Sequence, residues 1–344
     1  MEKLIIQSEN TLPPYRLVNS VVVLARIAAR YGVHRETLLE GSDIDPADLD
    51  DPQRIIRIEQ ERIVADRLIQ LTDVPWVGLE VGREYHFSAN GKLGMAVMCC
   101  ETVLEALKLI MAYIHLTGAY HQYIISIKGE TGYARFRELT DLKDVRRFTC
   151  EAEIASVNSM IRIGYNNAAV FREIHFAYPQ PVYADKYDEI FNCSVFFNAP
   201  ENLIVFDAGH LYRPMLMANP LVRSAMEKEC ARLSARLREQ DTLSARIYQE
   251  LWACREDGFP TLDEMARRIY MSTRTIRRRL TGENTSYKAI QTEIRKSMAS
   301  NLLLTTDLPM ETIATRLGFS EPSSFYRAFK TWTGCTPNTY RASR

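Results

Sequence analysis

The stretch TLDEMARRIYMSTRTIRRRL, residues 261–280, decides the fold of the C-terminal part of this 344-residue chain. Its first half carries apolar residues at the i, i+3, i+4 and i+7 spacing of a helix with one buried stripe, namely Leu262, Met265, Ala266 and Ile269. Ser272 can cap a second helix, in which Ile276 and Leu280 stand four residues apart. The stretch predicts two helices joined by a short turn.

A second stretch, PMETIATRLGFSEPSSFYRAFK at residues 309–330, repeats the pattern. An N-cap at Ser320 or Glu321, with Pro322 in the first turn, begins its second helix. The matching apolar residues are Met310, Ile313, Ala314 and Leu317, followed by the pair Phe325 and Phe329. Such a unit lays its second helix in a DNA major groove. The alternative is a pair of amphipathic hairpins in an ordinary helical bundle.

The outward faces of the second helices favour DNA binding. Arg274, Arg277 and Arg278 share one face, turned away from the apolar pair of their helix. Three guanidiniums on one face repel each other unless an anion binds, and arginine is suited to bidentate contact with guanine. The predicted DNA contacts are these three arginines with Thr275, and Ser323, Ser324 and Arg327 of the second unit.

The sequence between the two units, residues 286–309, predicts one long helix from the spacing of its apolar residues. A helix of about 20 residues spans about 30 Å. Successive major-groove turns on one face of DNA lie about 34 Å apart. We therefore expect this helix to hold the two units in register with two consecutive turns of the groove.

Charge separates the tail from the rest of a chain whose formal net charge is zero. From Thr261 onward there are 14 basic and 7 acidic residues, and the remainder has 29 basic and 36 acidic. This asymmetry indicates that only the tail meets a polyanion.

The larger N-terminal part predicts an α+β domain, because its helices and strands do not alternate as in a doubly wound parallel sheet. Residues 121–129 and 131–139 alternate around Gly129 and predict a hairpin. We expect helices over 18–29, 55–71, from Glu101 or Thr102 towards Leu116, and over 145–169, with strands at 171–179, 195–197 and 203–206.

Residues that carry enzyme chemistry do not form a recognisable set. The chain has no nucleotide-binding, nucleophile-elbow or zinc-protease motif, and its seven cysteines form no C-x-x-C pair. Cys99 and Cys100 lie in an apolar run and are expected to be buried. The cluster Tyr113, His115, Tyr120, His121 and Tyr123 either lines a cavity or forms core. We predict no catalytic residue, no metal and no cofactor.

No signal peptide or membrane span is expected, because no segment reaches the roughly 18 uncharged apolar residues needed to cross a bilayer. The cysteine content does not suggest a disulfide scaffold. The sequence therefore predicts a reduced, cytoplasmic protein.

The tail resembles the AraC/XylS transcription regulators. The run GFSEPSSFYRAFKTWTGCTPNTYR at 318–341 looks like that family's signature, and Arg295, Ala299, Leu302 and Leu303 match the R-x-x-x-A-x-x-L-L of its connecting helix. The resemblance implies that Arg274, Arg277 and Arg278 read bases and phosphates in the first unit, and Ser323, Ser324 and Arg327 in the second.

One residue departs from the family pattern. Tyr270 stands where the family has a turn glycine, which the second unit supplies as Gly318. If the backbone φ at this residue is positive, tyrosine destabilises the turn by about 1 kcal/mol relative to glycine. The alternative is that the first turn follows a slightly different path.

The N-terminal part is similar to the effector domain of one AraC subgroup, named for an arabinose-binding domain although its ligands vary. The matching stretches are DPADLDDPQRI at 45–55, GKLGMAVMCCETVLEALKLI at 91–110 and FNCSVFFNAPENLIVF at 191–206. The resemblance implies effector sensing and self-association, and leaves the effector and its contact residues unknown.

These observations predict an effector-sensing and oligomerisation domain over 1–218, a helical linker region over 219–240 and a DNA-binding domain over 241–344. The two helix-turn-helix units lie at about 261–281 and 309–331. The linker helix either contributes to dimerisation or packs on its own domain.

The chain is expected to be a homodimeric regulator that binds promoter DNA under control of a small-molecule effector. The family more often implies an activator that contacts RNA polymerase. The alternatives are an effector-independent architectural DNA-binding protein, which a solid N-terminal core would favour, and an enzyme with a DNA-binding tail.

Overall fold

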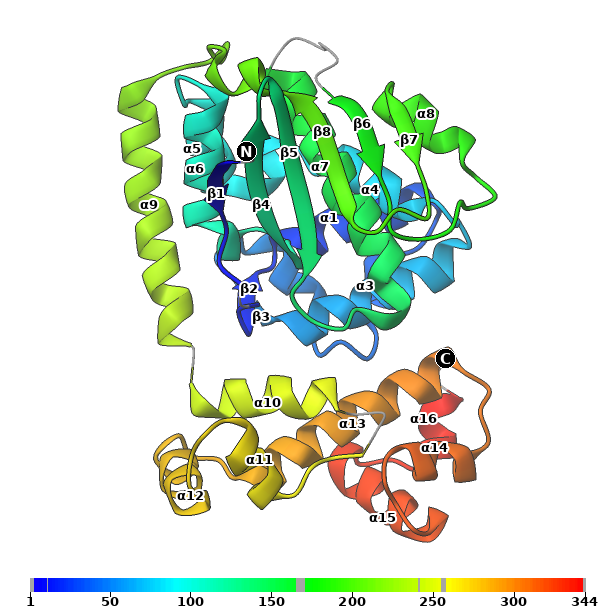
Figure 1. Cartoon of the computed structure of the whole chain (residues 1–344). Coiled ribbons are helices and arrows are strands. Elements are labelled where there is room, and N and C mark those ends of the chain that lie inside the picture. Colours follow the sequence, from blue (N-terminus) through cyan, green and yellow to red (C-terminus); the bar gives the residue numbers. More distant parts are fainter. Residues whose placement is uncertain (1–2, 11, 165–170, 241, 255–257, 343–344) are drawn as a thin grey trace.

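A six-stranded sheet organises the N-terminal part of the chain in the computed structural model (Figure 1), which describes residues 3–10, 12–164, 171–240, 242–254 and 258–342. The strand order is β1-β4-β5-β8-β6-β7, and only β6 and β7 pair in parallel. The strands are β1 (Lys3–Gln7), β4 (His121–Lys128), β5 (Thr131–Glu138), β6 (Phe171–His175), β7 (Ser194–Phe196) and β8 (Asn202–Asp207).

The predicted hairpin is confirmed. Strands β4 and β5 pair from His121 with Glu138 to Lys128 with Thr131, and Gly129 in the turn has a φ of 62°. The left-handed backbone explains why glycine stands there. Side chains on one sheet face, including Ile125, Ala134 and Ile204, pack with helix α7 (Arg146–Gly164) in one apolar core.

Helix α7 packs closely on α4 (Val77–Glu84), because α4 presents glycines to it. A Cβ at Gly82 would lie 2.4 Å from the backbone oxygen of Ala152. Around this pair lie α1 (Asn19–Arg30), α2 (Arg35–Leu39), α5 (Gly91–Met98), α6 (Val103–Ala112) and α8 (Asp185–Phe191), with 3-10 turns η1 (Pro46–Asp50), η2 (Phe87–Asn90), η3 (Ile114–Leu116), η4 (Lys143–Val145) and η5 (Ala208–Tyr212).

The helix expected over 55–71 begins three residues later than predicted. Strand β3 (Ile55–Arg57) pairs with β2 (Tyr15–Leu17) in a small separate sheet, and helix α3 runs from Ile58–Thr72. The Gln60 side chain accepts a hydrogen bond from the Arg57 backbone N–H at 2.9 Å, which caps the new helix. The apolar period continues across this junction, so the sequence did not reveal it.

Other N-terminal predictions hold with small shifts. Thr102 caps α6, as expected for a helix that starts near it. Helix α7 begins at Arg146, and the part of the predicted 145–169 helix that falls on 165–170 lies outside the described residues. Strands β1 and β2 were not predicted, because each is short and depends on a distant partner.

Helix α9 (Pro220–Glu239) packs on its own N-terminal domain (Figure 1). Lys92 of α5 pairs with Glu229 at 2.7 Å, and His115 Nε2 lies 2.8 Å from Ser234 Oγ. Cys230 is fully buried in the same contact. Of the two roles open to this helix, packing against its own domain is the one observed in the single chain.

The C-terminal part is entirely helical where it is described, as predicted. Its helices are α10 (Leu243–Ala253), α11 (Leu262–Arg268), α12 (Thr273–Gly282), α13 (Tyr287–Thr305), α14 (Met310–Arg316), α15 (Pro322–Thr333) and α16 (Pro337–Arg341). They form two cores, and α13 contributes Ile290 and Ile294 to one and Ala299 and Leu303 to the other. The long helix therefore joins two separately packed units (Figure 1).

Within the described ranges, no helix combines the length and apolar character needed to cross a bilayer. In that part of the chain, histidines, cysteines and carboxylates also form no group of three suited to a metal ion. Cys99 and Cys100 are buried, as expected.

Candidate nucleic-acid interface and effector cavity

The first helix-turn-helix unit comprises α11 and α12. Thr261 and Glu264 form a reciprocal capping box at the start of α11. Ser272 accepts a hydrogen bond from the Thr275 backbone N–H at 3.1 Å and caps α12, as predicted. Ile276 and Leu280 are almost completely buried, so α12 has one fixed inner face.

The outer face of α12 is strongly basic. Arg274, Arg277 and Arg278 are exposed, and within the described residues none of their guanidinium groups forms an ion pair or hydrogen bond. Thr275 is half-buried, and its hydroxyl lies 2.8 Å from that of Ser272. The three guanidiniums are therefore free to meet an anion, whereas Thr275 also takes part in the cap.

The turn of the first unit places Tyr270 in the left-handed region, with φ at 55°. Gly318 at the equivalent point of the second unit has φ at 76°. Both turns close with the same backbone bond, Met271 N–H to Ala266 and Phe319 N–H to Ala314, each at 2.9 Å. The two paths thus agree, and of the two explanations raised for Tyr270, conformational strain is the correct one.

Replacing Tyr270 by glycine is expected to stabilise the first unit by up to about 1 kcal/mol. A non-glycine residue pays about 1–2 kcal/mol in this backbone region, and the greater freedom of glycine in the unfolded chain offsets part of the gain. Tyr270 is 96% exposed, so little packing is lost. The urea midpoint of the C-terminal transition, followed in the full chain, should rise. Gly318→Tyr should lower it, and a lower midpoint for Tyr270→Gly would contradict the assignment of strain.

The second unit comprises α14 and α15, and its outer face is less basic. Glu321 is the N-cap residue, followed by Pro322. Ser323 is exposed and donates a hydrogen bond to the Glu321 carboxylate at 3.2 Å, Ser324 is half-buried, and Arg327 is exposed. A carboxylate at the start of this face reduces its attraction for phosphate relative to the first unit.

Arg295 in the middle of α13 holds the two units together. Its guanidinium carbon lies 4.9 Å from the ring centre of Phe259 and 5.9 Å from that of Phe319, and its Nε donates to the Leu317 carbonyl at 3.0 Å. Arg295 thus contacts the segment before the first unit and the turn of the second. The nineteen residues of α13 span about 28 Å.

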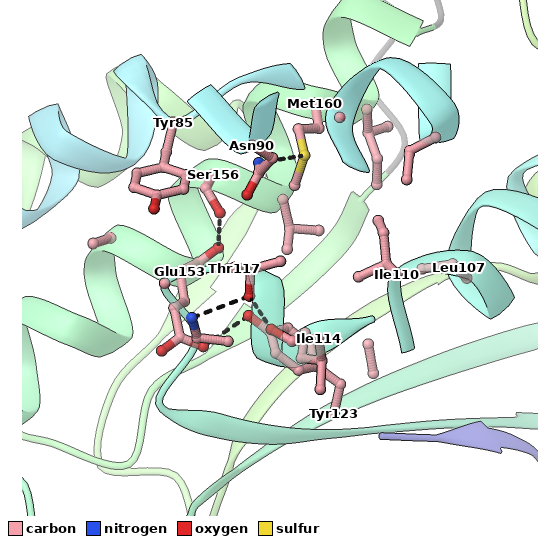
Figure 2. Close-up of a pocket in the computed structure, with 18 of the residues that line it drawn as sticks. Tyr85, Asn90, Leu107, Ile110, Ile114, Thr117, Tyr123, Glu153, Ser156 and Met160 are labelled. Atoms are coloured by element: carbon pink, nitrogen blue, oxygen red, sulfur yellow. Dashed lines mark hydrogen bonds between the residues drawn. The ribbon is translucent and has the colours of Figure 1, made fainter. Parts of the chain in front are cut away.

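The N-terminal domain contains a cavity of about 190 Å³ between the inner face of the sheet and helices α3, α5, α6 and α7 (Figure 2). Most of its lining is aliphatic or aromatic, with Leu107, Ile110, Ile114 and Met160 among the labelled side chains. All four of these side chains are half-buried. The N-terminal core is therefore hollow and not solid.

Two carboxylates reach this cavity, and both already have partners. Glu61 Oε2 lies 2.8 Å from Arg16 Nη1, and both side chains are buried. Glu153 accepts hydrogen bonds from the Tyr120 backbone N–H and the Tyr123 hydroxyl at 2.7 Å, and lies 3.0 Å from His121 Nδ1. Burial lowers the pKa of His121, but the adjacent Glu153 carboxylate outweighs this and raises it above its ordinary value.

The aromatic cluster considered from sequence divides in the structure. Tyr120 and Tyr123 line the cavity, whereas Tyr113, His115 and His121 lie outside its lining. The other cavity residues could not be predicted from the sequence, because they come from separate helices and strands. Tyr120 and Tyr123 were the available signal, since they stand close to the start of a predicted strand.

The N-terminal domain contacts the C-terminal domain through β3 and α3. Arg57 Nη1 pairs with Glu293 of α13 at 2.7 Å, and its guanidinium carbon lies 4.7 Å from the ring centre of Tyr248 in α10. Ile63 is 2% exposed and belongs to the same apolar core as Leu243 and other residues of the C-terminal domain. The two domains thus share one packed interface.

Glu59 lies on this side of α3 and is buried. Burial raises the pKa of its carboxyl to about 7, and its own backbone N–H and the nearby Arg57 and Arg62 only partly oppose the shift. Because the pKa of Glu59 is higher in the folded chain than in the unfolded chain, protonation of this carboxyl stabilises the fold. This stabilisation is complete below the unfolded pKa of about 4.5 and is lost as the pH rises through about 7.

Glu59→Gln is expected to stabilise the folded chain at pH 8 and to leave stability nearly unchanged at pH 4.5. The gain at pH 8 should approach about 3 kcal/mol, the cost of ionising a carboxyl so displaced. Urea unfolding at the two pH values measures this, with exposed Glu130→Gln as the control. Equal effects at both pH values would contradict the raised pKa.

Both halves of the chain match known protein families. Residues 32–215 match the family described as the N-terminal arabinose-binding domain of AraC transcription regulators. Residues 265–343 match a helix-turn-helix domain family. The ornithine utilization regulator of Pseudomonas aeruginosa is 31% identical over 318 residues, covering 92% of this chain and 94% of that protein. The transcriptional regulator VqsM of the same species is 30% identical, covering 77% of this chain and 83% of that protein.

Among solved structures, the transcriptional regulator CdpR from Pseudomonas aeruginosa aligns over 94% of this chain and 98% of its own, with 22% identity and a TM-score of 0.49. The family match rests on the sequence comparisons, which extend over nearly the full length, and on the two helix-turn-helix units described above. This chain belongs to the AraC family of transcription regulators and is a DNA-binding protein of the helix-turn-helix class.

Proposed function

We propose that a small molecule bound in the N-terminal cavity controls the DNA binding of this regulator. One observation carries the proposal, namely that helix α3 faces the cavity on one side and the DNA-binding domain on the other. Glu61 and Ala65 line the cavity. Ile63, about 180° away around the helix, packs in the core of the first helix-turn-helix unit, and Glu59 lies on the same side as Ile63.

A rigid helix between two sites can transmit a change in either. A ligand that displaces or fixes α3 alters the contact of Ile63, and that of Arg57 in the preceding strand, with the DNA-binding domain. Such control requires that the ligand bind the two domain arrangements with different affinity. Couplings of this kind change affinity about 5- to 150-fold. The hollow core supports this proposal over an effector-independent architectural protein.

The proposed DNA contacts are the exposed outer faces of the two recognition helices. In the first unit they are made by Arg274, Arg277 and Arg278, with Thr275 at the start of the helix. In the second they are made by Ser323, Ser324 and Arg327. Support comes from the exposure of the three unpaired arginines and from the burial of the opposite face of each helix.

Family membership supports three further proposals. We propose that the chain acts as an activator in contact with RNA polymerase, that it acts as a homodimer, and that it works in the cytoplasm, where bacterial promoter DNA lies. The named relatives are all transcription regulators, which supports a regulatory role without catalysis. Sedimentation of the full chain, free and on DNA, measures the number of copies.

The experiment that tests effector control uses a compound found by its ability to raise the melting temperature of the full chain. DNA selected from a random-sequence library serves as the target. We expect the compound to change the Kd for this DNA at least fivefold in the wild-type chain and in Lys108→Trp, where the new ring lies on the exposed face of α6.

Leu107→Trp fills the cavity from the same helix and should remove the response. Two results would overturn effector control through this cavity. One is a bound compound that leaves the DNA affinity unchanged, and the other is a response that persists in Leu107→Trp.

A further inference from the structure

We infer that the cavity takes a neutral, largely apolar molecule about the size of one substituted aromatic ring, and not a sugar, an amino acid or an organic ion. The inference rests on the proposed effector role and adds the chemical class of the ligand. It follows from the volume of the cavity, from the side chains that line it and from the partners that most of its polar groups already have.

The volume limits the ligand. Cavities of about 150 Å³ lined by aliphatic and aromatic side chains stay dry and bind benzene. At about 190 Å³, this cavity accommodates one ring with a short substituent, or a short alkyl chain. Its walls come from the sheet and from α6 and α7, as Figure 2 shows around Leu107, Ile110 and Met160.

The lining offers no unpaired charge among the described residues. It contains no lysine or arginine, and burial and the nearby Arg213 lower the pKa of its one histidine, His210, so an anionic ligand finds no permanent counterion. Glu61 is neutralised by Arg16, and Glu153 already accepts three hydrogen bonds or close contacts. A cationic ligand would therefore have to displace an internal partner. Burial of an ion without a partner is strongly unfavourable.

Most hydroxyl groups of the lining are also engaged within the protein, whereas the buried Tyr120 hydroxyl has no hydrogen-bond partner among the described residues. Thr117 donates to the Ile114 carbonyl at 2.7 Å, Ser156 to the Glu153 carbonyl at 2.8 Å, and Thr149 to the Val145 carbonyl at 3.0 Å. A buried sugar needs hydrogen-bond partners for each of its hydroxyl groups, which is more than the Tyr120 hydroxyl and the Asn90 amide can supply. The family description names arabinose and one relative is named for ornithine, but this lining suits neither molecule.

Asn90, together with the Tyr120 hydroxyl, sets the polarity of the ligand. Its amide nitrogen makes only long contacts, 3.5 Å to the His86 carbonyl and 3.9 Å to Met160 Sδ (Figure 2). The amide can therefore turn to a ligand at little cost. A hydroxyl, carbonyl or similar group on the ligand fits Asn90, a second can pair with the Tyr120 hydroxyl, and the rest of the ligand should be hydrocarbon.

The test uses three compounds that share one ring and differ in charge: 4-methylbenzyl alcohol, 4-methylbenzoate and 4-methylbenzylammonium, with p-xylene, L-arabinose and L-ornithine as references. Their Kd values for the full chain are measured by calorimetry at pH 7. We expect the alcohol and p-xylene to bind at least 100-fold more tightly than either ion, the sugar or the amino acid. Leu107→Trp should abolish this binding, and Lys108→Trp should preserve it.

The outcomes separate the two proposals. If either ion, the sugar or the amino acid binds as tightly as the alcohol and Leu107→Trp abolishes that binding, the neutral class is wrong and the cavity remains the effector site. If the neutral compounds bind equally well to Leu107→Trp, they lie elsewhere and the inference fails. If none of the compounds binds at millimolar concentration, the inference also fails, while effector control is still judged by the DNA-affinity experiment.

Discussion

Simultaneous replacement of Arg274, Arg277 and Arg278 by alanine should weaken binding to a selected DNA site by about 100-fold or more. Each arginine that reads a base or a phosphate is worth about 1–3 kcal/mol, and 1.4 kcal/mol corresponds to a tenfold change in Kd. Fluorescence anisotropy with DNA selected from a random library measures the loss. The fold should be unaffected, because all three side chains are exposed and unpaired.

Arg279→Ala is the matched control for this variant. It removes the same kind of side chain from the same helix, but Arg279 lies about 100° or more around the helix from Arg274 and Arg278. The control should lose less than tenfold. An equal loss of DNA affinity in the control, or no loss in the triple variant, would contradict the proposal that Arg274, Arg277 and Arg278 contact DNA. For single variants, an equal loss on random DNA identifies a phosphate contact, and a loss confined to the selected site identifies a base contact.

The same measurements compare the two units. The first has three arginines on its face, whereas the second has Arg327 with two serines and the Glu321 carboxylate nearby. Each lost phosphate contact lowers the slope of log affinity against log salt by about 0.9. Arginine-to-alanine changes in the first unit should therefore reduce the slope more than Arg327→Ala does. The opposite order would contradict the unequal division of the salt-dependent affinity.

Ile63→Asp is expected to separate the two domains and to abolish effector control of DNA binding. Ile63 is 2% exposed in the core shared with α10, so an aspartate there would bury an unpaired carboxylate at a cost of several kcal/mol. Opening the interface avoids this cost, because each domain has further apolar cores of its own. Small-angle scattering should show a larger radius of gyration, and the compound should still bind while the DNA affinity no longer responds to it.

Gln70→Asp supplies the control for this variant. Gln70 lies on the same side of α3 two turns later, where the side chain is exposed. It should change neither the radius of gyration nor the response to the compound. A response that survives in Ile63→Asp would show that the signal does not pass through this interface.

The sequence predicted the DNA-binding half well because its signals are local. Ser272 and Thr261 cap their helices through residues three positions away, and Ile276 with Leu280 marks the buried face within one turn. The strain at Tyr270 could also be anticipated, since a single glycine in the repeated unit pointed to it. Exposure of the arginine face follows from the same helical period.

The effector half was less predictable because its cavity depends on distant contacts. Glu61 of α3, Leu107 of α6 and Glu153 of α7 meet only after the sheet has formed. Strand β3 also escaped prediction, because the three residues before Ile58 fit the period of the helix that follows and become a strand only by pairing with β2. Local periodicity does not contain such information.

A hydroxyl-radical footprint of the full chain on a selected DNA site tests most directly that two units joined by α13 read one face of DNA. Two protected segments are expected on that face for each bound chain, with centres about one helical turn, or about 10 base pairs, apart. Alanine at Arg274, Arg277 and Arg278 should weaken protection of one segment first. A single protected segment, or two segments on opposite faces of the DNA, would show that the two units do not read one face together.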